Sequence, residues 1–381
     1  MKISKEQIKS ALDKLPYIRK DFDKFENIFD TYYHLLKDIL LYPLAWCYVV
    51  WSKRGPGKTY SGLWLCYYCD IKMIYIKRTD DDVDLILRED DRIDASPYKA
   101  LKRDKNIRVV SSSIDKGFGA YYEADAEGNP KRLLCYVISF NRMKSYKGFD
   151  FSDCDFIIFD EFIPQIGERI KRAEGEQLLD LYMTVSRDRV KRGRAPLKLI
   201  LFANAEQIST PVTTELEIVD DMADLTASGQ THLYIEDRDI LLHHITNEEV
   251  PISEQEKVGI YKGMQGTAWF NKSFNGEFVH NDFSNVVDRS IKRSVPFIEL
   301  HYRTHNYYIY FNEEKQRYYI CTKPARCRFY YDLNRENEQK KFYNDFCFDL
   351  IEACIEERFK FEKYSMYDLI VNFKKIFSIG Y

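Results

Sequence analysis

The sequence lacks an apolar run long enough to span a lipid bilayer. Its longest such stretch, "LLYPLAWCYVVW" at 40–51, contains Pro43 and is shorter than the ~20 residues that a membrane helix needs. The N-terminal "MKISKEQIKSALDKL" has no apolar core of the kind found in secretory signal peptides. We therefore expect a soluble, intracellular protein with no membrane partner.

The sequence also lacks an excess of charge and a disulfide framework. A net charge of -3 excludes a polybasic coat protein, so any binding of nucleic acid must rely on a local basic surface. The nine cysteines are odd in number and irregularly spaced, which suits a reducing cytosol. "CYYC" at 66–69 resembles half a zinc or redox site, but no second half follows. Leu63, Cys66 and Cys69 instead predict one buried helix face.

A glycine-rich segment, "SKRGPGKTYS" at 52–61, joins the apolar run "LAWCYVVW" to the helix-like "GLWLCYYCDI". A strand, a glycine-rich loop and a helix start leave several backbone N–H groups unpaired in front of a helix dipole, an arrangement that binds anions. The sequence therefore predicts a phosphate-binding loop.

Each residue of this loop fits one part of a Walker A motif. Gly55 and Gly57 let the backbone approach a phosphate, Lys58 can reach the β and γ phosphates, and Thr59 can hold Mg²⁺. Ser52 stands where the usual pattern begins with glycine, the residue that best tolerates positive φ. The alternative is an ordinary Gly-Pro turn that happens to precede a lysine.

A second motif, "CDFIIFDEF" at 154–162, predicts a buried strand that ends in two carboxylates. Strand carboxyl ends form the ligand crevice of α/β sheets, so the pattern matches Walker B. Asp160 would hold Mg²⁺ through water, and Glu161 would polarise the attacking water as general base. The alternative is a strand that ends in an acidic turn.

The segment "GEQLLDLYMTVSRDRVKRGRAPLKLILFANA" at 175–205 predicts a helix, a basic run and another buried strand. The helix is indicated by the spacing of Leu178, Tyr182 and Val185. Asn204 ends the strand, where it could sense the γ-phosphate or hold the water, or serve as a turn residue.

Two arginines in the basic run are candidates for a role between subunits. Arg187 and Arg189 are two positions apart and cannot share one helix face. One can therefore face its own subunit while the other reaches a neighbour as an arginine finger. The alternative is a solvated basic helix end that complements the helix dipole.

The order of strands and helices predicts an α/β fold with a parallel sheet. We expect strands at 44–51, 72–78, 106–113, 133–141, 154–160 and 197–205, with a last strand in 231–245 and a hairpin turn at "EGNPK". The predicted domains are an ATPase domain at 1–240 with a helical extension at 1–40, a helical linker at 241–285, and a small α+β domain at 286–381.

The C-terminal domain is expected to contain an antiparallel β-meander in "PFIELHYRTHNYYIYFNEEKQRYYICTK", followed by helices in "NDFCFDLIEACIEERFKFEKY" and "MYDLIVNFKKIF". Strand alternation puts one set of its tyrosines in the core. The other set could stack single-stranded bases or face a portal or a structural RNA, and packing is the favoured interpretation.

Taken together, the motifs resemble the DNA packaging ATPases (encapsidation proteins) of φ29-type tailed bacteriophages, which are related to large terminase subunits. The resemblance rests on "KRGPGKTY", "NRMKSYKGFDFSDCDFIIFDEF", "MTVSRDR" and "LFANA", in the same order over 50–205. It implies an ASCE-type P-loop ATPase domain followed by an RNase H-like, vestigial nuclease domain.

The resemblance also implies a function. Such a protein is a homo-oligomeric ring, expected to be a pentamer, that uses ATP and Mg²⁺ to pump viral double-stranded DNA into a prohead. Its partners would be that DNA and the portal or prohead, and a packaging RNA is left open. It would act in the host cell cytoplasm during virion assembly.

The resemblance carries roles onto individual positions. Arg54 falls on an arginine common in such loops, Arg187 on the trans-acting arginine, and Lys144 near a lysine that acts between subunits. The implied nucleotide-binding residues are Arg54, Gly55, Gly57, Lys58, Thr59, Tyr60, Lys144 and Asn204; the metal ligands are Thr59 and Asp160; and the catalytic residues are Lys58, Glu161 and Arg187. One departure is "KRTDDDVD" at 77–84, which is acidic where the family tends to be basic.

Three other functions fit parts of the sequence. A complete terminase would cut DNA with two metals held by three or four carboxylates. In 286–381, however, the first strand offers only Glu299, "NEEK" predicts a turn, and Glu352 is expected on a helix with no obvious partner. A nucleotide-dependent assembly switch would not need Glu161 as a general base. A generic helicase or another ring ATPase is excluded only by the family resemblance.

Overall fold

In the computed structural model of the chain, residues 32–379 are described except 89, 91, 92, 147, 166, 169, 279, 280, 282 and 288–290. The helical extension predicted at 1–40 therefore lies mostly outside the described residues. The chain divides into two compact units. The larger runs to Gln207 and resumes over Leu225–Val279, and the smaller comprises Ile208–Asp224 and His280–Tyr381. The three predicted domain ranges stay a prediction.

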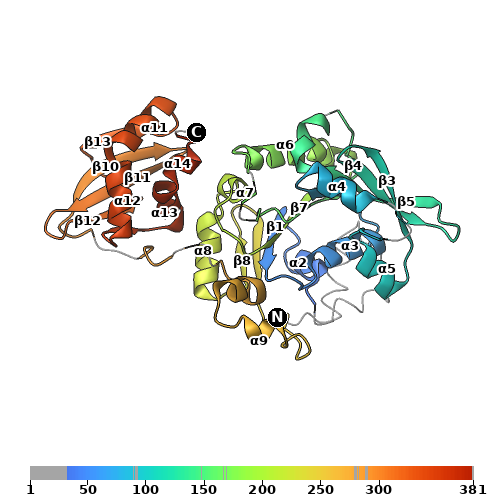
Figure 1. The fold of residues 1–381 in the computed structure, drawn as a ribbon. Coiled ribbons are helices and arrows are strands. Elements are labelled where there is room, and N and C mark those ends of the chain that lie inside the picture. Colours follow the sequence, from blue (N-terminus) through green and yellow to red (C-terminus); the bar gives the residue numbers. More distant parts are fainter. Residues whose placement is uncertain are drawn as a thin grey trace. The chain divides into compact units, whose positions relative to one another are not determined.

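The larger unit is built on a nine-stranded sheet in the order β3-β4-β5-β2-β6-β7-β1-β9-β8 (Figure 1). Its strands are β1 (Cys47–Ser52), β2 (Met73–Lys77), β3 (Val109–Asp115), β4 (Phe118–Ala124), β5 (Pro130–Ser139), β6 (Phe156–Asp160), β7 (Lys198–Asn204), β8 (His232–Ile235) and β9 (Ile240–Ile245). The six strands from β5 to β9 in this order pair in parallel. The expected α/β fold is confirmed, with a sheet that is mixed rather than purely parallel.

Antiparallel strands close both edges of this sheet. The segment 231–245, expected to be one strand, forms the hairpin β8–β9, because Asp239 turns the chain with a φ of 51°. At the other edge, the residues before the predicted "EGNPK" turn form a strand of their own, β4. The parallel strands thus have pairing partners on both sides, as buried parallel sheets require.

Helices cover the sheet and fix where its loops begin. They are α2 (Leu35–Leu41), α3 (Lys58–Tyr68), α4 (Asp80–Leu87), α5 (Lys99–Lys105), α6 (Glu174–Ser186), α9 (Ile260–Gly263) and α10 (Ala268–Phe270), with 3-10 helices at Phe140–Tyr146 and Val190–Arg192 and a π-helix at Asn271–Asn275. Leu63 and Cys66 of α3 and Cys69, which follows its last residue, are buried in the core as predicted. All nine cysteines are described, and none is in a disulfide.

The acidic stretch after β2 is explained by helix capping. Thr79 accepts a hydrogen bond from the backbone of Asp82, whose side chain accepts one from the backbone of Thr79 in return. Asp80 and Asp81 complete a first turn of three acidic residues, which the positive end of the helix dipole stabilises. This acidity therefore starts α4.

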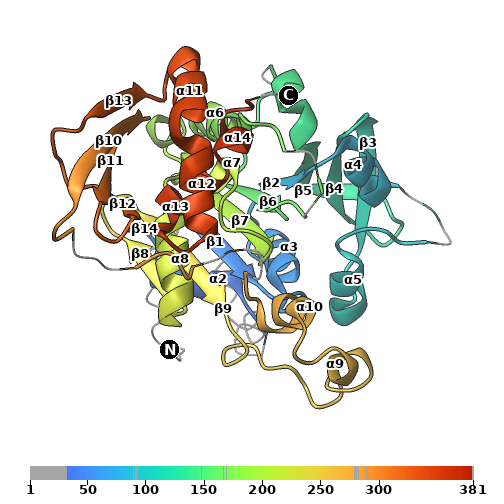
Figure 2. The same ribbon diagram turned by 60° about the vertical axis from the view of Figure 1, so that its left-hand side comes forward.

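The smaller unit has a five-stranded mixed sheet in the order β13-β10-β11-β12-β14. Its strands are β10 (Val295–Tyr302), β11 (His305–Asn312), β12 (Arg317–Cys321), β13 (Phe329–Asp332) and β14 (Phe359–Phe361), and its helices are α7 (Pro211–Glu215), the first part of α8 (Val219–Ser228), α11 (Glu336–Phe342), α12 (Phe348–Ile355), α13 (Tyr364–Val371) and α14 (Phe373–Ile376), with a π-helix at Tyr343–Cys347. Figure 2 shows α11–α14, in red, lying along the orange strands of this sheet.

The expected meander is present as β10–β11–β12, but "FKF", expected within a helix, is strand β14 and pairs in parallel with β12. Both faces of the meander are covered. Ile309 and Ile320 face the helical layer, while Tyr308, Tyr310 and Tyr319 are buried in a separate cluster on the other face. Packing, rather than base stacking, accounts for these tyrosines.

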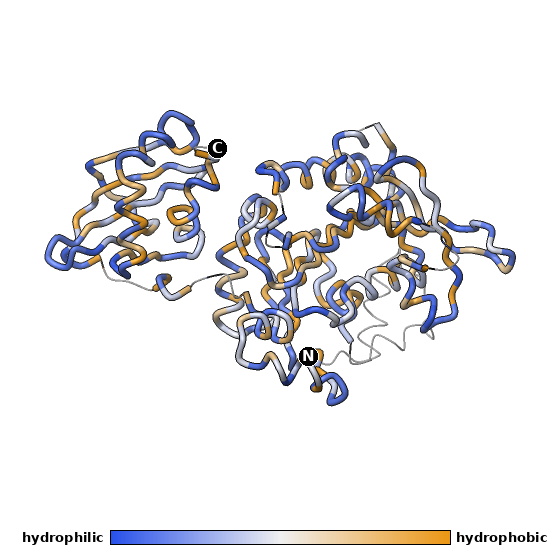
Figure 3. Tube along the Cα trace, viewed as in Figure 1, coloured by the Kyte–Doolittle hydropathy of each residue, from blue (hydrophilic) through white to orange (hydrophobic). Residues whose placement is uncertain are grey.

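Figure 3 colours the chain by hydropathy and shows apolar and polar segments alternating along the helices and strands of both units. In the part of the chain that the structure describes, no helix is both long and apolar enough to cross a membrane.

Candidate nucleotide-binding site

The predicted phosphate-binding loop lies at the carboxyl end of β1, between β7 and β9 (Figure 1). Gly55 and Gly57 have φ angles of 91° and 102°, and Gly57 is the N-cap of α3. L side chains rarely adopt this conformation, so both glycines are needed for the loop to fold over the helix start. The loop therefore presents the first N–H groups of α3 to one small volume.

Ser52 does not need to be glycine. It is the last residue of β1, fully buried, and it is not among the residues with positive φ. Its hydroxyl donates to the carbonyl of Lys53 at 2.5 Å and accepts a short hydrogen bond from Nζ of Lys58. A serine here holds the loop lysine in place.

Lys58 lies at the bottom of the loop with its ammonium group largely buried. Nζ also lies 3.3 Å from the Lys53 carbonyl and 3.4 Å from Oδ1 of Asn204. Burial lowers the pKa of Lys58 to about 8, and the nearby carboxylates of Asp160 and Glu161 oppose that shift. Neutral partners hold the ammonium group, and it remains available to a phosphate.

Thr59 and Asp160 meet, although about a hundred residues separate them in the sequence. The Thr59 hydroxyl lies 3.1 Å from each carboxylate oxygen of Asp160. A hydroxyl beside a carboxylate at a phosphate loop is the donor set with which P-loop enzymes hold Mg²⁺. These two residues fit that ion.

Asp160 has two further partners, on β2, that the sequence did not reveal. Tyr75 donates to Oδ2 of Asp160 at 2.6 Å, and Nζ of Lys77 lies 3.1 Å from the same atom. Burial, then the Asp160 charge, raises the pKa of Tyr75 well above its usual value. Burial alone would lower the pKa of Lys77, but Asp160 and Glu161 raise it. The sequence did contain one signal for these contacts. Tyr75 and Lys77 are two positions apart, so they lie on the same face of a predicted strand that ends in "KR".

Glu161 follows Asp160 in a strained conformation. Its φ is 60°, which is uncommon for a residue with a Cβ, and its carboxylate is half exposed, 3.3 Å from Nζ of Lys77. Backbone strain of this kind clusters at active sites, although Asp239 has a similar φ in the β8–β9 turn. The backbone of Phe162 donates to the carbonyl of Phe202 at 3.0 Å, which fixes the chain just after the turn.

Strand β7 lies between β1 and β6, so Asn204 comes beside the loop. It pairs in register with Ser52, and its side chain accepts from Lys58. Asn204 therefore ends the strand that lies between the loop strand and the Asp-Glu strand.

The loop and the strand ends enclose a cavity of about 380 Å³. Its lining comprises Arg54, Gly55, Pro56, Gly57, Lys58, Thr59, Tyr60, Asp160, Glu161, Gln165, Phe202, Ala203 and Asn204. This lining includes all the residues predicted to bind the nucleotide or the metal, except Lys144. Gln165 was not predicted, and no sequence pattern marks it.

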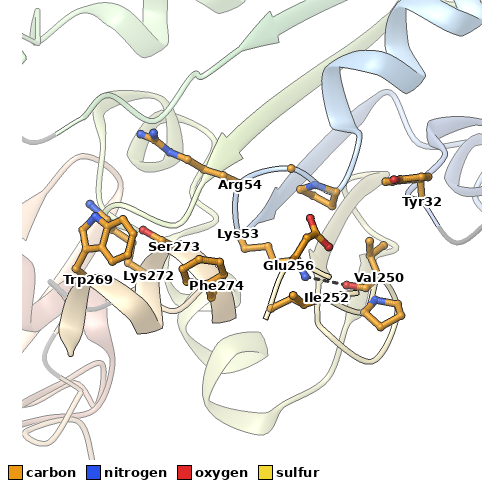
Figure 4. Close-up of a pocket in the computed structure, with 13 residues that line it drawn as sticks. Tyr32, Lys53, Arg54, Val250, Ile252, Glu256, Trp269, Lys272, Ser273 and Phe274 are labelled. Carbon is orange, nitrogen blue, oxygen red and sulfur yellow. Dashed lines mark hydrogen bonds between the residues drawn. The ribbon is translucent and has the colours of Figure 1, made fainter. Parts of the chain in front are cut away.

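A second cavity, of about 280 Å³, adjoins the other side of the same loop (Figure 4). It shares Arg54, Gly55 and Pro56 with the first, and Figure 4 shows Trp269 and Phe274 on one side and Tyr32 on the other. Nζ of Lys53 donates to the carbonyl of Val250 at 2.9 Å and to Asn247 at 2.6 Å. These bonds tie the loop to the segment after β9.

Arg187 and Arg189 differ sharply in their surroundings. Arg189 is 1% exposed; its guanidinium donates to the carbonyls of Ser152, Cys154 and Ala195 and pairs with Asp155 at 2.8 Å. Arg187 caps the C-terminal end of α6 and is exposed. Neither Arg187 nor the exposed Lys144, both of which the structure describes, lines the 380 Å³ cavity.

The fold has solved counterparts. Over 91% of its length the chain matches the whole of a chain in the bacteriophage Phi-29 viral genome packaging motor assembly, with a TM-score of 0.61 and 16% sequence identity. It has the fold of a phage packaging motor protein. The Phi-28 gp11 DNA packaging motor matches 88% of this chain and 96% of its own, with a TM-score of 0.56 and 16% identity.

The predicted likeness to φ29-type packaging ATPases is thereby confirmed for the fold. A looser likeness, with a TM-score of 0.38 and 14% identity, covers 98% of this chain and 81% of a large terminase from the thermophilic bacteriophage D6E. No protein-family model matches the sequence, and no curated protein sequence matches it either.

Proposed function

We propose that this protein is the ATPase of a phage DNA-packaging motor, which hydrolyses ATP with Mg²⁺ to move viral double-stranded DNA into a prohead. The observation that carries the proposal is the Thr59–Asp160 contact at the mouth of the loop, with Glu161 beside it, in a chain with the fold of packaging motor proteins. A switch would need the loop and Asp160 but not Glu161.

The residues of the cavity divide the chemistry among them. The loop N–H groups and Lys58 would bind the β and γ phosphates, while Thr59 and Asp160 would hold Mg²⁺, which screens the phosphate charge. Glu161 would take the proton of the attacking water, and Asn204 would orient that water. Closing these groups around the phosphates supplies the preorganised charges on which phosphoryl transfer depends.

The second cavity supports ATP as the nucleotide. Gly55 and Pro56 form part of both cavities, so a nucleotide that crosses the loop would place its base between Tyr32 and the aromatic pair Trp269 and Phe274. Aromatic walls suit a purine, and the neighbouring Lys272 and Glu256 offer polar groups to a sugar or base edge. Tyr60 and Arg54 would contact the phosphate side.

We further propose that the site is completed by a neighbouring subunit in a homo-oligomeric ring. Arg187 is exposed and lies outside the cavity lining of its own chain, whereas Arg189 is used internally. Arg187 would therefore be the trans-acting finger, with Lys144 as a second group from the neighbour. A pentamer, the portal or prohead, a packaging RNA and action in the host cytoplasm belong to the same proposal.

The smaller unit fits a vestigial, RNase H-like role better than an active nuclease. Two-metal cleavage needs carboxylates that converge on one point. Among the described residues of this unit, no three acidic, histidine or cysteine side chains come close enough together to hold a metal. This result supports the proposal that Glu299 and Glu352 are not part of a nuclease site.

The decisive experiment measures phosphate release with and without double-stranded DNA and proheads. We expect DNA-stimulated hydrolysis that both Glu161→Gln and Arg187→Ala abolish, while Arg192→Ala, which removes an exposed arginine of the same segment, leaves it intact. Mixing the two inactive variants should restore part of the rate, because one active site then combines an intact Glu161 with a neighbour's Arg187.

Two results would overturn parts of the proposal. An inactive wild type, even with DNA and proheads, would reject the motor. A wild-type rate in Arg187→Ala would reject the trans-acting arginine and leave the ATPase proposal standing.

A further inference from the structure

Three side chains from distant parts of the larger unit converge in a cluster away from the nucleotide site. Asp38 of α2, His232 of β8 and His243 of β9 each offer one ligand atom, and all three atoms lie within 4.8 Å of one another. His232 and His243 are direct partners in the β8–β9 hairpin, and their rings stack with centroids 3.8 Å apart. We call these three residues the Asp-His-His cluster.

The inner atoms of the cluster lie close to the spacing of metal ligands. Oδ2 of Asp38 lies 2.8 Å from Nδ1 of His243, and Oδ1 of Asp38 lies 3.7 Å from Nε2 of His232. A tetrahedral zinc ion with bonds of about 2.0–2.2 Å separates its ligand atoms by about 3.3 Å. Small side-chain shifts in opposite directions would bring both pairs to that spacing.

The outer atoms of the cluster are held by second partners. Nε2 of His243 lies 2.8 Å from a carboxylate oxygen of Glu249, and Nδ1 of His232 lies 2.9 Å from the hydroxyl of Thr231. Tyr33 donates to Oδ2 of Asp38 at 2.9 Å. Metal-binding histidines characteristically donate their second N–H to a carboxylate or another oxygen, which orients the ring and fixes its tautomer.

We propose that the Asp-His-His cluster binds a divalent transition metal, with Zn²⁺ as the best match and a water in the fourth position. Two imidazoles and one carboxylate suit zinc rather than Mg²⁺, which prefers oxygen ligands. Asp38 and His243 are almost fully buried, while the His232 side chain is 26% exposed and provides an entry path.

A simple hydrogen-bonded chain explains only part of this arrangement. Asp38, His243 and Glu249 could share protons without a metal. That chain leaves out His232, whose ring stacks on His243 and whose Nε2 faces the same Asp38 carboxylate at 3.7 Å, beyond ordinary hydrogen-bond distance. A metal ion between the three side chains accounts for both histidines.

The proposed ion would connect α2 to the sheet beside the nucleotide loop. His243 pairs in register with Val50 of β1, the strand that leads into the loop, and α2 directly precedes that strand. The ion would therefore join α2, β8 and β9, which supply its three ligands. Binding would stabilise the folded larger unit. This inference does not rest on the proposed ATPase function.

The test uses the untagged full-length chain, stripped of metal and then exposed to Zn²⁺ or Co²⁺. We expect one tightly held zinc per chain, a higher melting temperature with zinc, and the intense visible absorption of four-coordinate cobalt. His232→Ala should fold, because its side chain is partly exposed, but should lose all three effects. Glu249→Ala should weaken binding roughly 10–100-fold, as loss of a second partner does.

His301→Ala is the matched control, because His301 is a histidine of the smaller unit bound to Asn306 and should leave zinc binding unchanged. The proposal is wrong if the wild type retains no zinc, or if His232→Ala retains as much as the wild type. Cobalt spectra of a six-coordinate, loosely held ion would equally reject it.

Discussion

The ammonium group of Lys77 lies 3.1 Å from Oδ2 of Asp160, and the two residues end neighbouring parallel strands. The lysine also reaches Glu161 at 3.3 Å. One cation thus pairs with both carboxylates at the place where Mg²⁺ is proposed to bind. If Asp160 held the ion, Lys77 would keep Glu161 as its partner and would position the proposed general base.

This relationship predicts a catalytic defect without a binding defect. Lys77→Ala should lower the rate of ATP hydrolysis by roughly 10²-fold, the loss typical of removing one preorganised charge, while nucleotide affinity is retained. Steady-state phosphate release and binding of a fluorescent nucleotide measure the two quantities. Lys72→Ala is the control, since Lys72 precedes the same strand but pairs with Asp153. Equal rates in both variants would contradict the role of Lys77.

The phosphate-binding loop should also be displaced by a substitution of Gly276, which is remote from it in sequence. A Cβ on Gly276 would lie 2.6 Å from the backbone N of Lys53, whereas one on Gly128 would meet nothing within 4 Å. Both glycines have positive φ, so each alanine variant should lose on the order of 1 kcal/mol or more of stability from backbone strain. Only Gly276→Ala should also weaken nucleotide binding, because it displaces the loop. Equal affinities in the two variants, measured by nucleotide titration, would show that the loop tolerates the displacement.

Lys198 predicts a dependence of stability on pH. Its Nζ is held by the carbonyls of Pro43 and Ala45 and by the Tyr48 hydroxyl, and burial lowers its pKa to about 8 while Asp239 opposes the shift. Between pH 8 and the ordinary lysine pKa, the unfolded chain binds more protons than the folded one, so this residue makes stability rise with pH.

The measurement compares wild type with Lys198→Met by urea denaturation across pH 8 to 10. The wild type should gain up to about 1.4 kcal/mol per pH unit relative to the variant in this window. Comparing the two proteins cancels the titration of other groups. Parallel stability curves would show that the lysine keeps its ordinary pKa in the folded protein.

Much of the fold and of the nucleotide site follows from local sequence patterns. The loop residues, Asp160, Glu161 and Asn204 each end or follow a strongly apolar run, and the carboxyl ends of parallel strands meet at one edge of the sheet. The patterns failed where short segments mattered. "FKF" is only three residues long, and the turn inside 231–245 is made by charged residues that do not mark a break.

Tertiary packing determines what the patterns do not contain. Asp38 is remote in sequence from His232 and His243, which pair in the β8–β9 hairpin, and it becomes their neighbour only through the tertiary packing of α2. In the same way Tyr75 and Lys77 reach Asp160 only because β2 is the neighbour of β6. Neither adjacency is encoded in spacing, so no motif could predict these contacts.

The two arginines of the basic run are expected to have different roles, Arg189 in stability and Arg187 in activity. Removing the Arg189 side chain would leave the carbonyls of Cys154 and Ala195 without their side-chain donor and Asp155 without its partner, whereas the Ser152 carbonyl would keep its bond from Arg194. Loss of one member of a buried charge pair costs about 3–5 kcal/mol, so Arg189→Ala should be strongly destabilised in chemical denaturation. Arg187→Ala should stay within about 0.5 kcal/mol of the wild type, as exposed substitutions do. If Arg187→Ala were the destabilised variant and Arg189→Ala the stable but inactive one, the finger would be Arg189, and the buried contacts that assign it to its own subunit would have to open in the ring.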